Sequence, residues 1–321
     1  MLIVTEDTCR KVIGRGDAFA AVEAVFAAMA KGDAWNFPVV REAIGYADAL
    51  YGFKSGFDRA GLSLGVKSGG YWPGNSKKGL TNHQSTVFLF DPDSGQLQAL
   101  VGGNYLTAVR TAAASAVSIA HLARKNSTVL GILGAGHQST FQLRAALEQR
   151  EFEKVVGWNL HQDALSKLQV IAQENGLPFE SVEREQLAGE ADVIITITSA
   201  QESLIMKDWV RPGTHIACMG TDTRGKQEVD PALVAMASLF TDEITQSVTI
   251  GEAQHAVASG LISEDDISAI GDVINGAHAG RSSESEITLF DGTGVGLQDL
   301  AVASAAARLA VEQGMAQQVE L

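Results

Sequence analysis

The stretch TVLGILGAGHQSTFQL, Thr128 to Leu143, reads as a strand that runs into a glycine-rich turn and then a helix. In such a turn the backbone can approach a phosphate, and the N-terminus of the following helix attracts the negative charge. Gly134 permits the tight turn, Gly136 permits the close approach, and a small Ser139 stands where a third glycine is usual. We therefore predict a dinucleotide-binding turn that contacts its ligand through Gly134, Ala135, Gly136, His137, Gln138 and Ser139.

The chain beyond this turn alternates strand and helix patterns. Strands are expected at KVVGWN, ADVIITITSA and THIACMG, and helices over 138–150 and 163–175. Alternation of this kind predicts a Rossmann-type, doubly wound parallel sheet with helices on both faces.

The chain on either side of this region has a different pattern of expected helices and strands. Asp17 is expected to cap an alanine-rich helix, and STVFLFDPDSGQLQALV predicts a hairpin that turns at 91–95. Further helices are expected over about 106–124 and 294–317. We predict an α/β protein in which the Rossmann-type domain, 116–297, is inserted in an α+β domain made of 1–115 and 298–321.

Composition limits the partners and the compartment. The 321 residues carry a net charge of −14, which repels phosphate backbones, so we expect no nucleic-acid partner. The N-terminus does not resemble a signal peptide and no run of 18 apolar residues exists, so we expect no membrane association. Two isolated cysteines fit a reducing cytosol, and a cytoplasmic location is expected. We predict no metal site.

The end of the second strand, VVGWNLHQD, bears on the choice of cofactor. An acid there would bind the ribose hydroxyls of NAD, and an arginine would favour the 2′-phosphate of NADP. This chain places Asn159 at the tip, with no arginine nearby, and Asn159 can still hydrogen-bond a ribose hydroxyl. NAD(H) is therefore favoured over NADP(H), although His161 keeps NADP(H) open.

Several motifs together resemble the ornithine cyclodeaminase/mu-crystallin family. They are LGVKSGGYWPGN, NHQSTVFLFDPDSG, GGNYLTAVRTAAASAVSIAHLA, GILGAGHQS, ADVIITITSA, GTDTRGKQEVD and ITLFDGTGVGLQDLA. The resemblance runs from about Pro38 to the C-terminal helix. It implies a nicotinamide-binding Rossmann domain beside a domain that binds substrate and forms a homodimer.

The resemblance also assigns site residues. It implies that Arg41, Lys67 and Arg110 bind the substrate carboxylate, and that Asp222 acts as an acid or base. Planar guanidinium groups suit carboxylates because they bind both oxygens at once. Lys67 and Asp222 are thus the predicted catalytic residues. Further cofactor contacts are expected from Thr111, Asn159, Thr198, Ser199, Met219, Gly220 and Thr293.

Lys54 decides between branches of the family. Ornithine cyclodeaminases carry a glutamate thirteen places before the conserved lysine, whereas this chain has Lys54 there. A cation at that position repels ornithine and attracts a second carboxylate, and His83 is expected to assist it. The resulting hypothesis is an NADH-dependent oxidoreductase that reduces an α-imino dicarboxylate, with iminosuccinate to L-aspartate as the best candidate.

Three other activities stay open at this point. An ornithine cyclodeaminase-type lyase would recycle its NAD, and Asp222 is consistent with it. An alanine dehydrogenase-type enzyme would act on a short monocarboxylic oxo acid and leave Lys54 without a role. A binding protein like mu-crystallin would not need Asp222, which mu-crystallin lacks.

Overall fold

The computed structural model describes residues 1–320 and contains two eight-stranded sheets, one in each of two units. One unit comprises residues 1–110 and the segment from Val295 onward, and the other comprises Thr111–Gly294. The expected domain boundaries, 115/116 and 297/298, lie a few residues beyond these division points.

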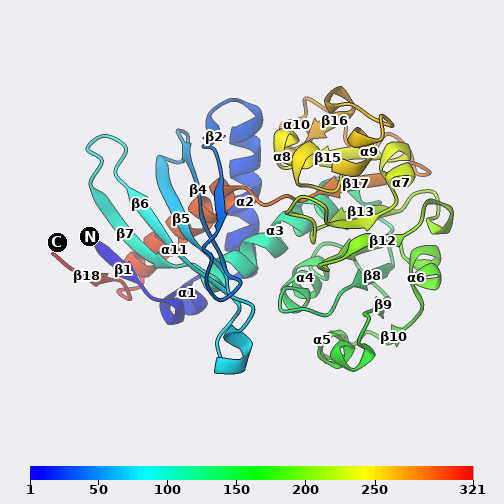
Figure 1. Ribbon diagram of the computed structural model, residues 1–321, viewed down its shortest axis with the longest axis horizontal. Helices are drawn as coiled ribbons and strands as arrows, with labels where there is room; N and C mark the ends of the chain where they lie inside the picture. Colours follow the sequence, from blue (N-terminus) through cyan, green and yellow to red (C-terminus); the bar gives the residue numbers. More distant parts are fainter. Residues whose placement is uncertain (321) are drawn as a thin grey trace. The chain divides into compact units, whose positions relative to one another are not determined.

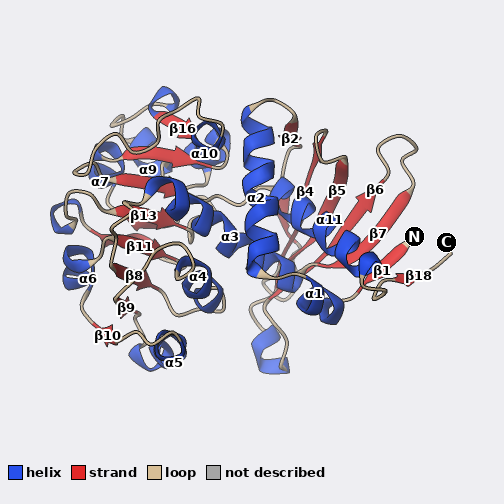
Figure 2. Cartoon of the chain, turned by 180° about the vertical axis from the view of Figure 1, so that it is seen from behind, coloured by secondary structure: helices blue, strands red, loops and turns tan. Residues whose placement is uncertain are grey.

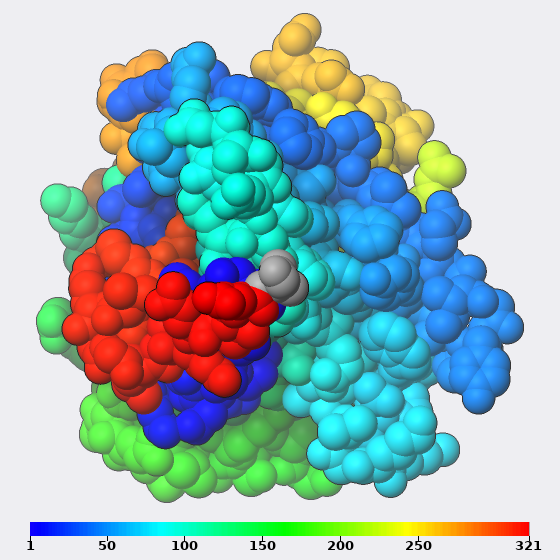
Figure 3. Space-filling view, turned by 90° about the vertical axis from the view of Figure 1, so that its left-hand side faces the viewer, coloured from blue at the N-terminus to red at the C-terminus, as the bar shows by residue number. Residues whose placement is uncertain are grey.

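The first unit is built on a mostly antiparallel sheet whose main path has the order β18-β1-β7-β6-β5-β4-β2, with β3 also paired to β4. Its strands are β1 (Leu2–Val4), β2 (Ala34–Asn36), β3 (Val40–Ala43), β4 (Leu50–Asp58), β5 (Ser63–Tyr71), β6 (His83–Phe90), β7 (Leu97–Gly102) and β18 (Gln317–Gln318). Its helices are α1 (Glu6–Val12), α2 (Arg15–Ala30), the short 3-10 turn η1 (Asn75–Lys78) and α11 (Gly296–Glu312). The two chain ends lie side by side in Figure 3, because β18 pairs with β1.

Alternation along the strands of the first unit separates two faces of the sheet. On β5, Gly65 and Lys67 are buried, whereas Leu64 and Val66 are only partly buried. The helices α2 and α11 lie on one face of the sheet, as Figures 1 and 2 show from opposite sides. A Cβ on Gly65 would lie 2.9 Å from a methyl of Leu300, so α11 packs on the face that contains Lys67.

At the start of helix α3 (Asn104–Leu122), the first backbone N–H groups of the helix donate to a carboxylate. Glu6 accepts hydrogen bonds from the N–H groups of Asn104, at 2.6 Å, and Tyr105, at 3.0 Å. These donors have no partner within the helix, and a negative charge at its N-terminus is favourable. Glu6 thereby ties the start of α1 to the start of α3.

The second unit is a parallel sheet of order β10-β9-β8-β11-β13-β17-β15-β16, beside a two-stranded sheet, β12-β14. Its strands are β8 (Val129–Leu133), β9 (Lys154–Trp158), β10 (Phe179–Ser181), β11 (Val193–Thr196), β12 (Gln201–Ile205), β13 (His215–Cys218), β14 (Gln227–Val229), β15 (Ser238–Thr241), β16 (Ile267–Ala269) and β17 (Thr288–Asp291). Its α-helices are α4 (Ser139–Ala146), α5 (Ser166–Glu174), α6 (Arg184–Glu190), α7 (Pro231–Met236), α8 (Ile244–Thr249), α9 (Gln254–Ala258) and α10 (Ile270–Ile274). Its 3-10 turns are η2 (Gln162–Leu165), η3 (Lys207–Trp209) and η4 (Glu264–Asp266).

The order of this sheet contains a topological switch point. From β8 the chain moves outward to β9 and β10, and it then returns to the other side of β8 to form β11 and β13. Ligands of doubly wound sheets bind at the carboxyl ends of the strands at such a point. The predicted Rossmann-type, doubly wound parallel sheet is confirmed.

Most predicted elements are present, with shifted ends. The hairpin β6–β7 is confirmed, and Gly95 in its turn has φ +73°. The expectation for Asp17 was wrong, because α2 already begins at Arg15 after Gly14. Asp17 instead stands in the first turn and accepts from the Gly14 N–H at 2.9 Å. Among the described residues, no helix is long and apolar enough to cross a membrane.

We expect Glu6→Ala to lower the free energy of unfolding by about 1 kcal/mol, because two partly buried N–H donors of α3 lose their acceptor. Thermal unfolding followed by circular dichroism measures the effect. Asp7→Ala is the matched control, because Asp7 is exposed and forms only a surface ion pair with Lys11. Equal melting temperatures for the two variants would contradict the capping role of Glu6.

Candidate active site

A buried cluster of charges stands at the centre of the first unit. Asp299 on α11 forms ion pairs with Lys67 Nζ on β5, at 2.6 Å, and with Arg110 Nε on α3, at 2.9 Å. All three side chains are at most 8% exposed. Arg110 Nη1 donates to Gln298 at 2.8 Å, and Nη2 makes no hydrogen bond to any described residue. The structure thus brings together two of the predicted carboxylate ligands, with one remaining guanidinium nitrogen available to a ligand.

Strand register places the other predicted substrate residues on the same sheet face. Lys54 stands directly opposite Lys67 in the β4–β5 ladder, and Arg41 stands opposite Gly52, two residues before Lys54. His83 pairs with Tyr71, four residues after Lys67. Because side chains alternate along a strand, all four residues belong to the face that α11 covers. Their burial differs, since Lys67 is buried and Arg41 is exposed.

Burial controls the protonation of Lys67. Desolvation lowers its pKa from 10.5 to about 7, and the positive charges of Arg110 and Lys54 act in the same direction. The carboxylate of Asp299 opposes this change because it stabilises the ammonium. Lys67 is therefore poised near neutrality, where a side chain can both hold and release a proton.

His83 is a neutral side chain in this environment. Burial lowers its pKa to about 3, and the nearby charge of Lys67 adds to the shift. The expectation that His83 assists Lys54 therefore holds only for a hydrogen bond from a neutral imidazole. It supplies no positive charge for a second carboxylate.

The glycine-rich turn lies in the second unit, between β8 and α4. Gly134 has φ +106°, and a Cβ there would lie 2.4 Å from the carbonyl oxygen of Ile197, so no other residue fits without strain. A Cβ on Gly136 would meet nothing within 4 Å, which leaves open space above the turn. Ser139 is buried at the start of α4 and donates to the Gly136 carbonyl at 2.8 Å.

Several polar groups of this turn have no partner among the described residues. The buried Oε1 atom of Gln138 accepts no hydrogen bond. The backbone N–H groups of Gly136 and Gln138 also donate to no described residue. Unpaired donors at the start of a helix suit a phosphate group, so the turn fits the pyrophosphate of a dinucleotide.

Asn159 makes two hydrogen bonds within the second unit. Its Oδ1 atom accepts from the Ala135 N–H at 3.0 Å, and its Nδ2 atom donates to the His161 carbonyl at 2.8 Å. Asn159 therefore links the end of β9 to the glycine-rich turn.

The other predicted cofactor residues lie at the carboxyl ends of neighbouring strands. Thr198 and Ser199 follow β11, Met219 and Gly220 follow β13, and Thr293 follows β17. Thr293 is buried, and its hydroxyl donates to Asp242 at 2.6 Å. The remaining one, Thr111, lies in α3, where its carbonyl accepts from Gln142.

Asp222 lies in the loop that follows β13. Its carboxylate forms an ion pair with Lys226 at 2.7 Å and accepts from the Thr223 hydroxyl at 3.1 Å. The side chain is 39% exposed, so the carboxylate is within reach of solvent.

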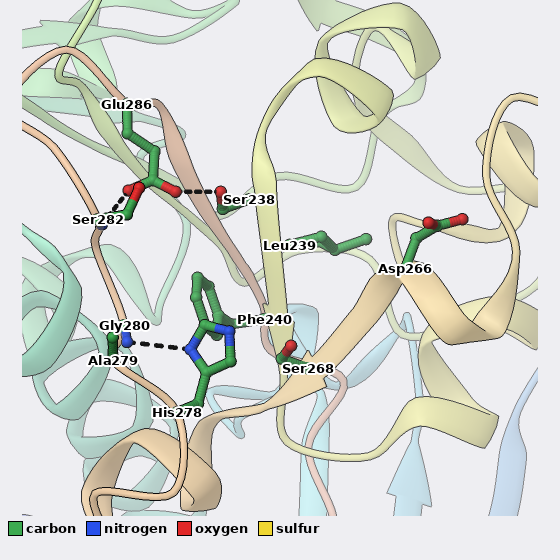
Figure 4. A pocket seen from close by; sticks show the side chains of 10 residues that line it. All are labelled: Ser238, Leu239, Phe240, Asp266, Ser268, His278, Ala279, Gly280, Ser282 and Glu286. Carbon is green, nitrogen blue, oxygen red and sulfur yellow. Dashed lines mark hydrogen bonds between the residues drawn. The ribbon is translucent and has the colours of Figure 1, made fainter.

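A cavity of the second unit lies at the opposite edge of its sheet. Its volume is about 340 Å³, and Figure 4 shows it beside the amino ends of β15, β16 and β17. Its carboxylate Glu286 is already satisfied by the Ser238 hydroxyl and the Ser282 N–H, and His278 accepts from the Gly280 N–H. The cavity contains none of the predicted site residues. Among the described residues, no group of three or more His, Cys, Asp or Glu could hold a metal ion.

The model of the ornithine cyclodeaminase/mu-crystallin family matches residues 6–313. The chain belongs to this family. An iminosuccinate reductase from Paracoccus denitrificans is 61% identical to it over 321 residues, the whole of both chains. The crystal structure of the iminosuccinate reductase of that organism in complex with NAD+ superimposes with a TM-score of 0.97, at 61% identity, over 100% of this chain and 99% of the other. An archaeal alanine dehydrogenase dimer with bound NAD superimposes with a TM-score of 0.93, at 32% identity, over 100% and 99% of the two chains.

The residues that hold the predicted site residues in place were not predicted from the sequence. Asp299 and Gln298 form a polar pair inside the otherwise apolar segment GVGLQDLAVASAAA, and that contrast was a usable signal. Lys226 and Glu228 stand in GKQEVD, where polar residues are ordinary for a turn and give no signal.

We expect Asp299→Asn to move the titration midpoint of Lys67 to lower pH by about one pH unit. The change removes the negative charge that favours the ammonium form, whereas the desolvation stays. Carbon-13 NMR of the labelled lysine Cε atoms, with the Lys67 signal assigned by Lys67→Arg, measures the midpoint. Gln298→Ala, which alters a neutral neighbour on the same helix, serves as the control. An unchanged midpoint in Asp299→Asn would show that Asp299 does not control this proton.

Proposed function

We propose that the protein reduces iminosuccinate to L-aspartate, with NADH as the hydride donor. The observation that carries the proposal is the excess of positive over negative side chains around Lys67. The charged groups that shift the pKa of Lys67 are two cations, Arg110 and Lys54, and one anion, Asp299. Together with Lys67 itself, up to three positive charges face one negative charge. Buried charges of one sign are unfavourable until counter-charges arrive, and a dicarboxylate supplies two. The 61% identity to the Paracoccus denitrificans enzyme supports the same substrate.

Different residues are proposed to bind the two carboxylates of the substrate. We assign the α-carboxylate to Arg110 and Arg41, because a guanidinium binds both oxygens of a carboxylate. Lys54 is assigned the distal carboxylate, and the neutral His83 ring adds a hydrogen bond. Lys67 then holds its proton beside the imine nitrogen.

The reaction adds one hydride and one proton across the carbon–nitrogen double bond. NADH, when bound, would supply the hydride for the imine carbon, and the electron pair of the double bond would move to the nitrogen. Lys67 donates the proton that this nitrogen takes up, and its pKa of about 7 suits that role at neutral pH. The carboxylate of Asp222 accepts hydrogen bonds from Lys226 and Thr223. We assign it the role of a hydrogen-bond acceptor that orients a polar group or a water molecule.

The second unit supplies the groups that fit the cofactor. The open space at Gly136 and the unpaired backbone N–H groups of Gly136 and Gln138 suit the pyrophosphate. Thr198, Ser199, Met219, Gly220 and Thr293 are the proposed contacts at the strand ends. The tip of β9 bears Asn159 and no arginine, which favours NAD(H) over NADP(H). The solved relatives with NAD+ or NAD support the same choice.

A second copy of the chain is the proposed partner of the uncovered face of the first sheet. That face contains Val40, Tyr51 and Phe53, which are 38–45% exposed, together with the partly buried Val66 and Phe88. No helix of the first unit covers it (Figure 1). Exposed apolar patches of this kind mark interfaces between proteins, and the alanine dehydrogenase relative is a dimer.

A cytoplasmic location completes the proposal. Both cysteines, Cys9 and Cys218, are buried free thiols, which suits a reducing compartment.

We expect the purified protein to oxidise NADH rapidly with oxaloacetate and ammonia, which form iminosuccinate in solution, and slowly with pyruvate and ammonia. Lys54→Glu should lower kcat/KM with oxaloacetate about 100-fold, because the distal carboxylate loses its cation and meets a like charge. Lys11→Glu, which reverses an exposed lysine of the same unit, should leave the rate unchanged. NADH absorbance at 340 nm follows the reaction.

Two other outcomes of this assay would contradict the dicarboxylate assignment. Faster turnover with pyruvate would indicate an alanine dehydrogenase-type enzyme. Ammonia release from ornithine without net NADH change would indicate a cyclodeaminase-type lyase.

We expect Phe53→Asp to convert the dimer into a monomer, because a charge on the uncovered sheet face has no counter-charge there. Multi-angle light scattering after size-exclusion chromatography should give twice the chain mass for the wild type and one chain mass for the variant. Val170→Asp, at an exposed apolar residue of α5, should remain a dimer. A dimeric Phe53→Asp would exclude this face as the interface.

A further inference from the structure

Glu228 is a fully buried carboxylate that the proposed reaction does not use. It is 0% exposed, and none of the main causes of its pKa shift is a cation. Instead it accepts four hydrogen bonds: from the Thr196 hydroxyl at 2.7 Å, the Thr198 N–H at 2.6 Å, the Thr198 hydroxyl at 2.7 Å and the Gly220 N–H at 2.9 Å. Burying a carboxyl group is unfavourable unless hydrogen-bond donors surround it, and these four donors stabilise Glu228 in its buried position.

The four donors belong to two adjacent strand ends. Strands β11 and β13 pair in parallel up to Thr196 and Cys218, and the sheet ladder stops there. Beyond that point Glu228 receives the N–H of Thr198 from one chain segment and the N–H of Gly220 from the other. The two segments also touch, because a Cβ on Gly220 would lie 2.4 Å from the Thr198 carbonyl oxygen. Glu228 therefore replaces the missing ladder contacts and sets the spacing of the two loops.

A second acid holds Glu228 itself. Glu252 accepts from the N–H groups of Glu228 and Val229, at 2.8 and 2.7 Å, and its other oxygen hydrogen-bonds the Thr221 hydroxyl at 2.5 Å. Burial and the charge of Glu228 raise the pKa of Glu252 to about 8, so Glu252 holds a proton at neutral pH. Burial also raises the pKa of Glu228, and the hydrogen bonds from its four donors oppose that shift.

Hydrogen bonds continue from Glu228 to Asp222. Glu228 holds the N–H of Gly220, and the carbonyl of Gly220 accepts from Lys226 Nζ at 3.1 Å. The same Nζ atom forms the 2.7 Å ion pair with Asp222. A shift of the Gly220 segment would therefore move both a proposed cofactor contact and the Asp222 carboxylate.

We infer that Glu228 is a positioning residue, which fixes the strand-end loops of Thr198 and Gly220 in the conformation that binds the nicotinamide cofactor and orients Asp222. The inference rests on the proposed binding of NADH to this chain. Glu228 is 0% exposed, so it acts through the backbone N–H groups of Thr198 and Gly220, which are proposed cofactor contacts.

The test compares Glu228→Gln with Asp192→Asn. A glutamine offers one acceptor oxygen, so its NH2 group faces at least one of the N–H donors that the carboxylate held. Asp192 is the matched control because it is also buried and accepts two backbone N–H groups, those of Thr128 and Val129, at the amino edge of the same sheet. Both substitutions replace a buried carboxyl group near an end of β11 by its amide.

Hydrogen–deuterium exchange on the cofactor-free protein gives the first readout. Glu228→Gln should speed the exchange of the amides in 196–200 and 218–222 and leave 128–131 unchanged. Asp192→Asn should do the reverse. This readout does not depend on enzymatic activity.

NADH titration by fluorescence gives the second readout. Glu228→Gln should raise the Kd for NADH about tenfold and lower kcat, whereas Asp192→Asn should change Kd less than twofold even if its melting temperature falls more. Wild-type affinity in Glu228→Gln, or the same loss of affinity in both variants, would overturn the inference. A wild-type chain that does not bind NADH would instead contradict the proposed function.

Thr196→Val keeps the test decisive if Glu228→Gln does not fold. Valine has nearly the shape of threonine and removes one of the four donors while the carboxylate stays. We expect a smaller change of the same kind, with faster exchange over 196–200 and 218–222 and about threefold weaker NADH binding. Unchanged exchange and unchanged Kd in this variant would also overturn the inference.

Discussion

Asp299, with one negative charge, forms ion pairs with two cationic side chains, those of Lys67 and Arg110. All three side chains are buried. This imbalance explains the state of the surrounding groups. Lys67 has a pKa of about 7 because desolvation outweighs its carboxylate partner, and His83 is neutral because burial, and then the nearby cations, lower its pKa. The same imbalance gives an incoming dicarboxylate its favourable interaction. The ion pair of Asp299 with Lys67 therefore links the packing of α11 on the sheet to the proposed proton transfer.

The second unit meets a related constraint with a different solution. At the carboxyl edge of its parallel sheet, buried acids accept from backbone N–H groups and hydroxyls of the loops. Glu228 holds Thr198 and Gly220, and Asp242 holds the N–H groups of Thr293 and Gly294. Asp291 shares this edge, where burial raises its pKa to about 7. The loops that carry the proposed cofactor contacts are thus ordered by internal carboxylates before any ligand binds.

Local patterns made much of this architecture predictable, and long-range pairs did not. The strand–turn–helix at Thr128–Leu143 and the hairpin around Gly95 rely on local backbone geometry, which glycine and alternation report directly. Lys67 and Arg110 were predicted from family motifs, yet Asp299 was not, because it lies 189 residues after Arg110 in the chain. The neutral state of His83 depends on burial and on charges from other strands, so no reading of NHQST could provide it. The contacts of Asn159 and Glu228 were hidden for the same reason, since they join backbone and hydroxyl groups of separate chain segments.

The pairing of β1 with β18 means that the first unit needs both ends of the polypeptide. During synthesis, residues Thr111–Gly294 leave the ribosome as one continuous stretch that contains its whole sheet, whereas the first unit still lacks α11. Lys67 and Arg110 must remain hydrated until Asp299 follows, because burying them earlier would leave two cations without a counter-charge. The order of translation therefore lets the inserted unit fold first, and the charged cluster closes only after the segment with Asp299 has been synthesised.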